Sequence, residues 1–157
     1  MGMERLNITA MTNSSLTALW AEGRTRFTKL LEVVQETDLS KKNGDSPNSA
    51  GFLIRHIAEV ELLFAKNVFG LAEVKIVAKT LIAGKDMGEW TDLAELREIA
   101  AYAAEMLEKA ISLQEDWDQV IETKEFGKKT KAEALGRITT HTAYHSGQLA
   151  LVLKYGK

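Results

Sequence analysis

The sequence predicts an all-α protein, a four-helix bundle with longer crossover connections. Four segments carry apolar residues at intervals of three and four, which is the spacing of one helical face. A single proline, Pro47, leaves long helices uninterrupted. The 157 residues are 45% hydrophobic, which is enough for one core in a single helical domain over residues 1–157. We expect residues 1–12 to form a flexible N-terminal segment of that domain.

The expected helices span residues 13–36, 47–69, 92–114 and 130–154. Asn13 or Ser14 is a suitable N-cap for the first helix, because either side chain can accept a hydrogen bond from a free backbone amide. The second helix is expected to begin after Ser46, with Pro47 at the first helical position, where a missing N–H costs nothing. We expect that helix to end near Gly70.

The later elements are separated by longer connections. The third helix is expected to begin at the Thr-Asp pair 91–92, and Thr130 with Glu133 has the pattern of a capping box at the start of the fourth. Residues 71–82 have the spacing of a short helix. Residues 116–129 favour an irregular crossing or a small hairpin, and no larger sheet is expected. Connections of these lengths argue against a symmetric bundle of alternating helix direction.

Composition and charge exclude several classes of function. Lys plus Arg is 20 and Asp plus Glu is 22, so the chain lacks the basic excess of a nucleic-acid-binding domain. Cysteine is absent, which excludes disulfides, cysteine-type zinc sites and a cysteine nucleophile. Apolar runs fall far short of the roughly 18–20 residues that span a bilayer, and the first residues lack the apolar core of a signal peptide. We therefore expect no nucleic-acid or membrane partner and a cytoplasmic location.

The three histidines of the chain, His56, His141 and His145, all fall on the apolar faces of expected helices. His141 and His145 are four residues apart, so their side chains lie one above the other on the same helical face. That spacing lets two imidazole nitrogens reach one ion at about 2.0–2.1 Å, and His56 would face the same interior from another helix. Buried histidines are also ordinary hydrogen-bonded core residues, so the spacing alone leaves both interpretations open.

The segments around the histidines carry a family resemblance. Residues 141–149, HTAYHSGQL, have two histidines four apart followed by a Gly-Gln pair, and residues 49–59, SAGFLIRHIAE, contain the third histidine. These segments resemble the last-helix signature and the second-helix motif of the DinB-like superfamily, metal-binding four-helix proteins also called the YfiT type. The resemblance extends from about residue 13 to 155. It implies a DinB-like domain that binds a divalent metal through His56, His141 and His145, and three neutral imidazoles suit zinc or nickel.

A site with three protein ligands leaves one coordination position open. A divalent metal can make bound water available for hydrolysis at neutral pH, or deprotonate a bound thiol. The resemblance implies a metal-dependent enzyme acting on small molecules, either a thiol S-transferase that uses a low-molecular-weight thiol or a hydrolase. The alternative is a non-enzymatic bundle that binds a metal or a stress ligand. Relatives often carry Arg directly after the second histidine, where this chain has Ser146, so recognition of an anionic substrate is left open.

Three further side chains are candidates for a position beside the metal or in a pocket. Glu59 follows His56 by three residues, and its alternative is a solvated carboxylate. Gln148 follows His145 by three residues and could hydrogen-bond a ligand imidazole or fix helix packing. Trp20 lies on the inward face of the first expected helix and could line a pocket or fill the core. No catalytic base is identified.

The resemblance also implies a homodimer, since many relatives dimerise through bundle helices. Ile99, Met106 and Ile111 on the third expected helix are predicted to face outward and to contribute to a partner surface. Scattered exposed apolar residues are the alternative explanation of these three positions.

Overall fold

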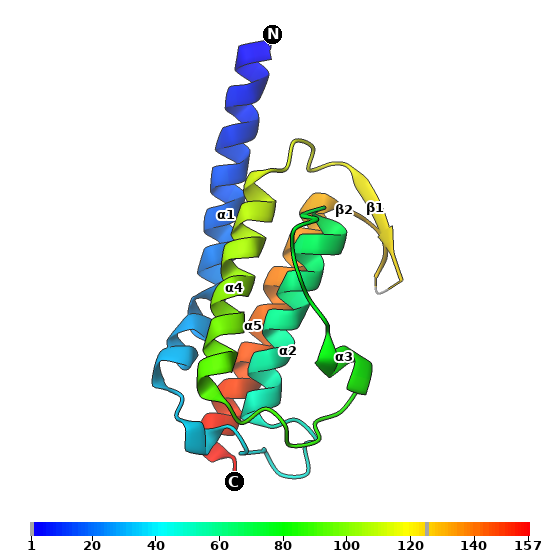
Figure 1. The fold of residues 1–157 in the computed structure, drawn as a ribbon. Coiled ribbons are helices and arrows are strands. Elements are labelled where there is room, and N and C mark those ends of the chain that lie inside the picture. Colours follow the sequence, from blue (N-terminus) through cyan, green and yellow to red (C-terminus); the bar gives the residue numbers. More distant parts are fainter. Residues whose placement is uncertain (1, 125) are drawn as a thin grey trace.

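The computed structural model describes every residue except 1 and 125, and for residues 2, 3, 5 and 6 it describes only the backbone. Within this described part, four long helices form a bundle (Figure 1). They are α1 (Gly2–Val33), α2 (Ala50–Leu63), α4 (Leu93–Ser112) and α5 (Lys131–Tyr155). A 3-10 turn η1 (Glu36–Asp38), a π-helical turn η2 (Phe64–Val68), a short helix α3 (Lys79–Ala83) and one two-stranded sheet complete the fold. The all-α prediction is confirmed.

The four long helices occupy the corners of a square. α1 packs against α4 and α5, and α2 packs against the same two helices. α1 and α5 run in one direction, and α2 and α4 run in the other (Figure 1). Because α2 and α4 are parallel neighbours, residues 69–92 must return along the length of the bundle. This return confirms the predicted long crossover.

α1 begins earlier than predicted, at Gly2, and its first turns extend beyond the ends of the other helices (Figure 1). Asn13 is therefore a residue of the helix interior, and its predicted role as N-cap is wrong. Its amide donates to the carbonyl oxygens of Ser112 and Gln114 at 3.0 and 2.8 Å, and its Oδ1 accepts from Trp117 Nε1 at 2.7 Å. Asn13 thus joins α1 to the end of α4. Flexibility of residues 1–12 stays a prediction.

α2 begins later than predicted. Its N-cap is Ser49, whose hydroxyl accepts from the backbone N–H of Phe52 at 3.1 Å. The predicted start after Ser46, with Pro47 inside the helix, is wrong because the residues before Ser49 are not helical. Ser49 and Lys42 form an isolated antiparallel β-bridge, which holds this part of the chain extended. The helical stretch ends with η2 at Val68, close to the predicted end.

α4 begins as predicted, with Asp92 accepting from the backbone N–H of Glu95 at 2.9 Å. The predicted outward placement of Ile99, Met106 and Ile111 is wrong. Met106 and Ile111 are buried in the core and Ile99 is partly buried against it. The reason is that α4 contacts α1, α2 and η2, so its buried face is wider than the single stripe that periodicity identifies.

The connections differ from each other in regularity. Residues 116–129 contain the predicted hairpin, with β1 (Val120–Thr123) antiparallel to β2 (Gly127–Thr130). The hairpin leads directly into α5, whose predicted capping box between Thr130 and Glu133 is present. The helix predicted over residues 71–82 is confined to α3, because the chain before α3 is extended along the bundle.

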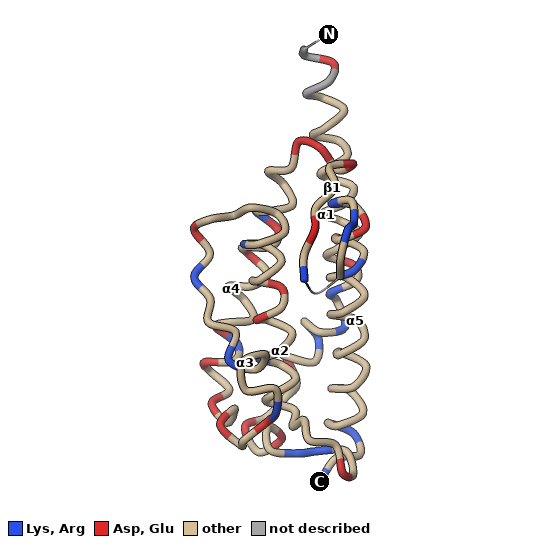
Figure 2. The backbone as a smooth tube through the Cα atoms, turned by 90° about the vertical axis from the view of Figure 1, so that its right-hand side faces the viewer, with Lys and Arg blue, Asp and Glu red and all other residues tan. Residues whose placement is uncertain are grey.

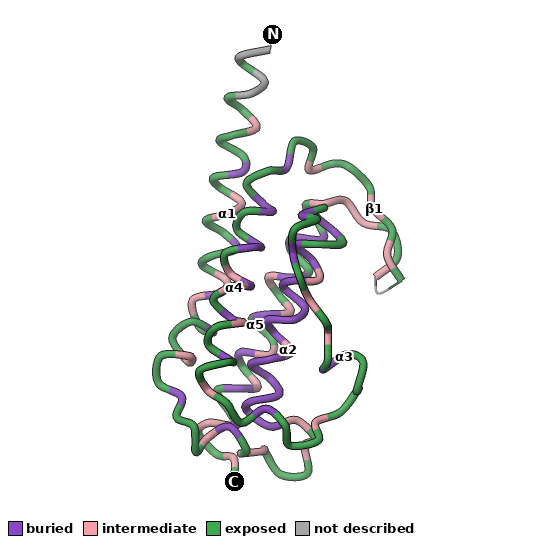
Figure 3. Tube along the Cα trace, viewed as in Figure 1, coloured by how far each residue is buried: buried purple, intermediate pink, exposed green. Residues whose placement is uncertain are grey.

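The core lies between the four long helices, whose buried residues line the inward sides (Figure 3). In the view that faces α3 and the hairpin, basic and acidic residues are mixed along the chain (Figure 2). Among the described residues, no helix is long and apolar enough to cross a membrane.

Candidate metal centre

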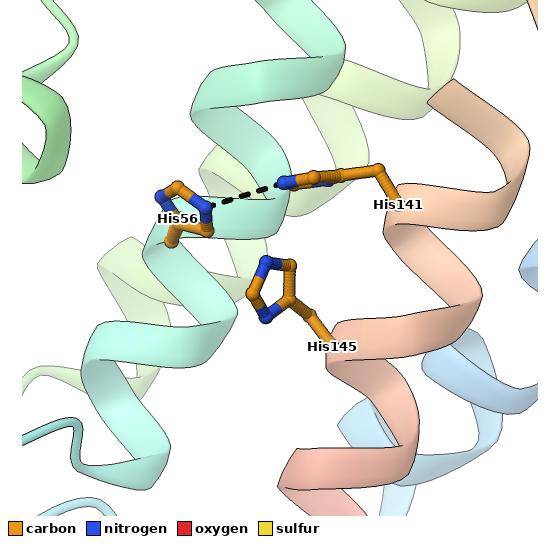
Figure 4. Close-up of side chains that lie close together, drawn as sticks. All are labelled: His56, His141 and His145. Atoms are coloured by element: carbon orange, nitrogen blue, oxygen red, sulfur yellow. Dashed lines mark hydrogen bonds between the residues drawn. The ribbon is translucent and has the colours of Figure 1, made fainter. Parts of the chain in front are cut away.

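The three histidines meet in the space between α2 and α5. His56 lies at the middle of α2, and His141 and His145 lie one turn apart on α5. The three rings face one another, each with a nitrogen directed toward the others (Figure 4). The ring centroids are separated by 5.1 Å for His56 and His141, 4.8 Å for His56 and His145, and 4.5 Å for His141 and His145. One nitrogen from each ring lies within 4.8 Å of the other two.

The spacing of one pair of these nitrogens matches that of two ligands on a tetrahedral ion. The Nε2 atoms of His56 and His141 are 3.3 Å apart. Two ligand nitrogens about 2.05 Å from a tetrahedral zinc ion lie about 3.3 Å from each other. The pair is therefore already at the separation that a shared ion requires. The structure brings together all three residues that the sequence predicted as ligands.

A hydroxyl group fixes the proton on His56. The Nδ1 of His56 lies 3.2 Å from Oγ1 of Thr80, at the start of α3. The hydroxyl of Thr80 donates to the carboxylate of Glu59, so its oxygen is left to accept from His56. His56 therefore carries its proton on Nδ1, and the lone pair of Nε2 faces His141. This is the arrangement that a histidine ligand needs.

Glu59 accepts the hydrogen bond from the Thr80 hydroxyl. Its carboxylate is fully buried and accepts from Arg55 Nε at 2.7 Å. It also accepts from the backbone N–H groups of Lys79 and Thr80, at 3.0 and 2.8 Å. The alternative of a solvated carboxylate is thereby excluded. Glu59 instead anchors α3 against α2 and reaches His56 through Thr80.

The other two histidines differ in their partners. The Nδ1 of His145 lies 2.6 Å from Oε1 of Gln148, and because an amide oxygen only accepts, the proton of His145 is on Nδ1. Its Nε2 is then free for a ligand bond. The Nδ1 of His141 is buried and has no hydrogen-bond partner among the described residues. The ring nitrogens of Trp20 and Trp90 are likewise buried without a described partner, so the geometry of the Nε2 atoms, and not this unpaired atom, marks the cluster as a candidate metal site.

Burial keeps the imidazoles neutral. The pKa of His56 is lowered to about 4, mostly by desolvation and in part by His145, with Glu59 opposing the change. Desolvation likewise lowers the pKa of His141 to about 3, assisted by His145, His56 and Arg137. The pKa of His145 is lowered by burial and raised in part by Gln148. Neutral imidazole is the form that binds a metal, so the cluster is in its ligand form at neutral pH.

Two positions singled out in the sequence lie away from the cluster. Trp20 is buried in the hydrophobic core, and other residues line the cavity beside the histidines. Ser146, the position that follows the last histidine, is also buried. Its hydroxyl donates to the carbonyl oxygen of Thr142 at 2.6 Å.

A cavity of about 350 Å³ opens beside His56 and His141. Its walls come from α2, η2, α3, the hairpin and α5, and they include Val60, Phe64, Asn67, Leu81, Phe126 and Arg137. Sequence analysis identified none of these as site residues. Arg137 could have been found, because it precedes His141 by one helical turn. Nothing in the sequence marked Thr80, since it lies in α3 and contacts His56 of α2 only through the fold.

The comparison with known families matches this description. A family model described as the DinB superfamily matches residues 19–149, a range that includes all three histidines. Among curated proteins, none matches the chain.

Proposed function

The chain belongs to the DinB superfamily, and from this membership and the histidine cluster we propose a divalent-metal-dependent enzyme that acts on small molecules. The proposed reaction is thiol S-transfer with a low-molecular-weight thiol, or hydrolysis. The observation that carries the proposal is the position of the cluster. Three neutral imidazoles converge, and two of them, His56 and His141, line a cavity of about 350 Å³, a size that suits a small-molecule substrate.

Zinc or nickel is the metal we propose, held by the Nε2 atoms of His56, His141 and His145. Imidazole ligands suit both ions, and three protein ligands leave one position for a substrate group. When bound, such an ion supplies Lewis-acid activation of that group. The site's own residues would prepare this chemistry by fixing ligand protons and by limiting access of water.

The supporting residues have separate roles in the proposal. Thr80, backed by Glu59, holds the proton of His56 on Nδ1, and Gln148 does the same for His145. The apolar side chains of Phe64 and Phe126 restrict water on the cavity side, with ring centroids 5.7 Å apart. We do not propose Glu59 as a catalytic base, because its carboxylate already accepts four hydrogen bonds.

A second candidate function is non-enzymatic binding of a metal or a stress ligand by the same bundle. One observation favours it: among the described residues that line the cavity, none is a carboxylate that could act as a general base. A substrate that needs no base from the protein would remove this objection to the enzyme.

Assembly and location are part of the same proposal. We propose a cytoplasmic homodimer, with a partner surface on α1 and α5, where Leu19, Tyr144 and Leu151 are exposed. The neighbouring positions of α1 and α5 would let these side chains form one surface. Light scattering at micromolar concentration should then give twice the 17.4 kDa mass of one chain, and a 17.4 kDa particle would contradict the dimer.

Metal analysis of protein purified without a nickel column is the direct test. We expect one zinc or nickel ion per chain in wild type and almost none in His56→Ala. A screen of thiols with electrophiles, and of ester and amide substrates, should then give activity that depends on the ion. The proposal fails if saturating zinc and nickel leave wild type empty and the melting temperatures of wild type and variant equal. Metal binding with no activity across the screen would favour the second candidate function.

A further inference from the structure

We propose that the cavity beside the histidines takes a ligand with an apolar body and an anionic group, and that Arg137 binds the anionic group. This inference rests on the proposed function, because it takes the same cavity as the substrate site, and it adds the chemical class of the substrate. The anionic group is a carboxylate, sulfonate or phosphate ester, which share an oxygen geometry that a guanidinium recognises.

The walls of the cavity are suited to an apolar body. Val60 and Phe64 come from the α2 side, Leu81 from α3 and Phe126 from the hairpin turn. Phe64 and Phe126 form a tilted aromatic pair across two of these elements. Burial of aliphatic or aromatic surface against such walls is favourable by roughly 25 cal/mol per Å², so the apolar part of a ligand would supply much of its affinity.

Arg137 is the charged residue of this cavity. Among the described lining residues it is the only Lys, Arg, Asp or Glu, and its guanidinium makes no hydrogen bond or ion pair with a described residue. The acidic residue one turn earlier, Glu133, already accepts from the backbone N–H and hydroxyl of Thr130. With respect to the described residues, the guanidinium is therefore available to a ligand.

The buried acidic residues nearby are also committed to other partners. Glu59 is paired with Arg55, and Glu61 is paired with Arg24. Neither carboxylate lines the cavity. The cavity therefore presents positive charge without a described acidic residue in its wall to neutralise it, which favours an anion over a cation.

The position of Arg137 on α5 sets the orientation of the ligand. Arg137, His141 and His145 follow one another at four-residue spacing, so they share one face of the helix. Arg137 is close enough to contribute to the lowered pKa of His141. An anionic group held at Arg137 would place the apolar body on Phe64 and Val60 and direct another part of the ligand toward the histidines.

The π-helical turn η2 contributes a second polar group. Asn67 lies on this turn and lines the cavity, while the other cavity residues of the turn, Phe64 and Val68, are apolar. π-helical turns occur often at functional sites, and this one ends the α2 helical stretch at the cavity. The Asn67 amide can donate to a second oxygen of the anionic group or to a polar substituent of the ligand.

A matched pair of fluorescent probes tests the inference. 8-Anilinonaphthalene-1-sulfonate and N-phenyl-1-naphthylamine share the same ring body, and only the first carries an anionic group. We expect the full-length, metal-free protein to bind the sulfonate at least about tenfold more tightly than the neutral probe. We expect Arg137→Gln to weaken sulfonate binding about tenfold, the factor of a typical charge-assisted hydrogen bond, and to leave the neutral probe within about twofold.

Two further variants locate the binding. Lys66→Gln removes an exposed cation of η2 that does not line the cavity, and it should leave both probes unchanged. Leu81→Glu places a carboxylate at the cavity wall on a half-exposed position, and it should weaken both probes, the sulfonate most. Equal weakening of sulfonate binding by Arg137→Gln and Lys66→Gln, or no effect of Arg137→Gln, would overturn the inference.

Zinc binding measured on the same proteins separates this inference from the proposed function. Arg137→Gln should not weaken zinc binding, since Arg137 is not among the three ligands and its positive charge opposes a cation at His141. Arg137-dependent sulfonate binding in a protein that takes up no zinc would support the inference while the proposed metal function fails. Zinc uptake without any dependence of sulfonate binding on Arg137 would reject the inference alone.

Discussion

Two polar clusters include residues of both α2 and α5, and they differ in how completely their polar atoms are paired. The cluster around Glu61 is buried, whereas the three histidines are partly buried. Around Glu61, Arg24 donates through Nε and Nη2 at 3.0 Å each, and the hydroxyl of Thr142 donates at 3.0 Å. Around His56, the imidazole nitrogens of neighbouring rings face each other, and the Nδ1 of His141 has no partner among the described residues.

The comparison separates a structural cluster from a candidate site. Burial raises the pKa of Glu61, and the guanidinium of Arg24 and the hydroxyl of Thr142 oppose this change. The carboxylate and the guanidinium complete each other, so the cluster needs nothing from outside. The histidine cluster holds three lone pairs with no described donor other than one another. A buried cluster that is fully paired stabilises a fold, whereas three imidazoles that turn nitrogens toward one another could share those nitrogens with a metal ion.

The largest effect is expected on stability when the fully paired cluster around Glu61 loses one partner. Arg24→Met removes the three guanidinium hydrogen bonds to Glu61 and leaves a buried carboxylate without its counter-ion. We expect the free energy of unfolding to fall by about 3–5 kcal/mol, as for other buried pairs that lose one partner. Denaturant unfolding measures this change. In the control, Lys109→Met breaks the half-exposed pair with Glu73 and should cost no more than about 1 kcal/mol. Equal costs for the two variants would show that the buried pair has no special weight.

The next largest effect is expected on zinc affinity when the histidine cluster loses one of its three members. His56→Ala leaves only the pair on α5, and we expect zinc affinity to fall by more than about 100-fold, beyond the loss typical of residues that only support a ligand. Saturating zinc should raise the melting temperature of wild type and not of the variant, because a ligand of the folded state stabilises it. Competition titration with a chelator of known affinity measures the first change, and thermal unfolding measures the second. Unchanged zinc affinity in His56→Ala would mean that His56 is a core residue.

A smaller effect on zinc affinity is expected from Thr80, which lies at the edge of the histidine cluster. Thr80→Val keeps the size of the side chain and removes the hydroxyl between His56 and Glu59. We expect zinc affinity to fall by about 10–100-fold, the usual cost of losing an outer partner of a ligand histidine. Thr80→Ser restores the hydroxyl and should keep zinc affinity near that of wild type. If both variants bind zinc as wild type does, Thr80 does not orient His56.

The last prediction concerns the pH dependence of stability in the metal-free protein. In the folded protein the pKa of His56 is about 4 and that of His141 about 3, below the ordinary value of 6.5. Between these values the unfolded chain binds protons that the folded protein excludes. The stability from neutral histidines is therefore fully present above about pH 6.5 and is lost as the pH falls toward 4.

We expect the melting temperature of metal-free protein to fall through this range, and the fall to be shallower in a His56→Gln, His141→Gln double variant. Ordinary histidine pKa values would place the release of zinc between about pH 6 and 5, and burial should move it lower. Parallel melting curves against pH for wild type and the double variant would contradict the burial of these histidines.

The sequence determined the features that arise within a few turns of one helix. Periodicity located all four long helices, and the start of α5 at Thr130 with Glu133 followed from local hydrogen bonding. The spacing of His141 and His145 placed both on one face. These predictions succeed because their interactions lie within one turn, where backbone geometry leaves little choice. His56 was predicted to face the same interior because it lies on the apolar face of the second expected helix.

Only the tertiary structure decided what surrounds the histidines. The contact of Thr80 with His56, the cavity wall contributed by Phe126, and the burial of Met106 depend on how distant segments pack. The return of residues 69–92 along the bundle carries α3 to His56, and nothing local in that segment indicates its destination. The physical reason is that a histidine's position on a helix is set by its own turn, whereas its proton, its burial and its free lone pair are set by neighbours from other elements.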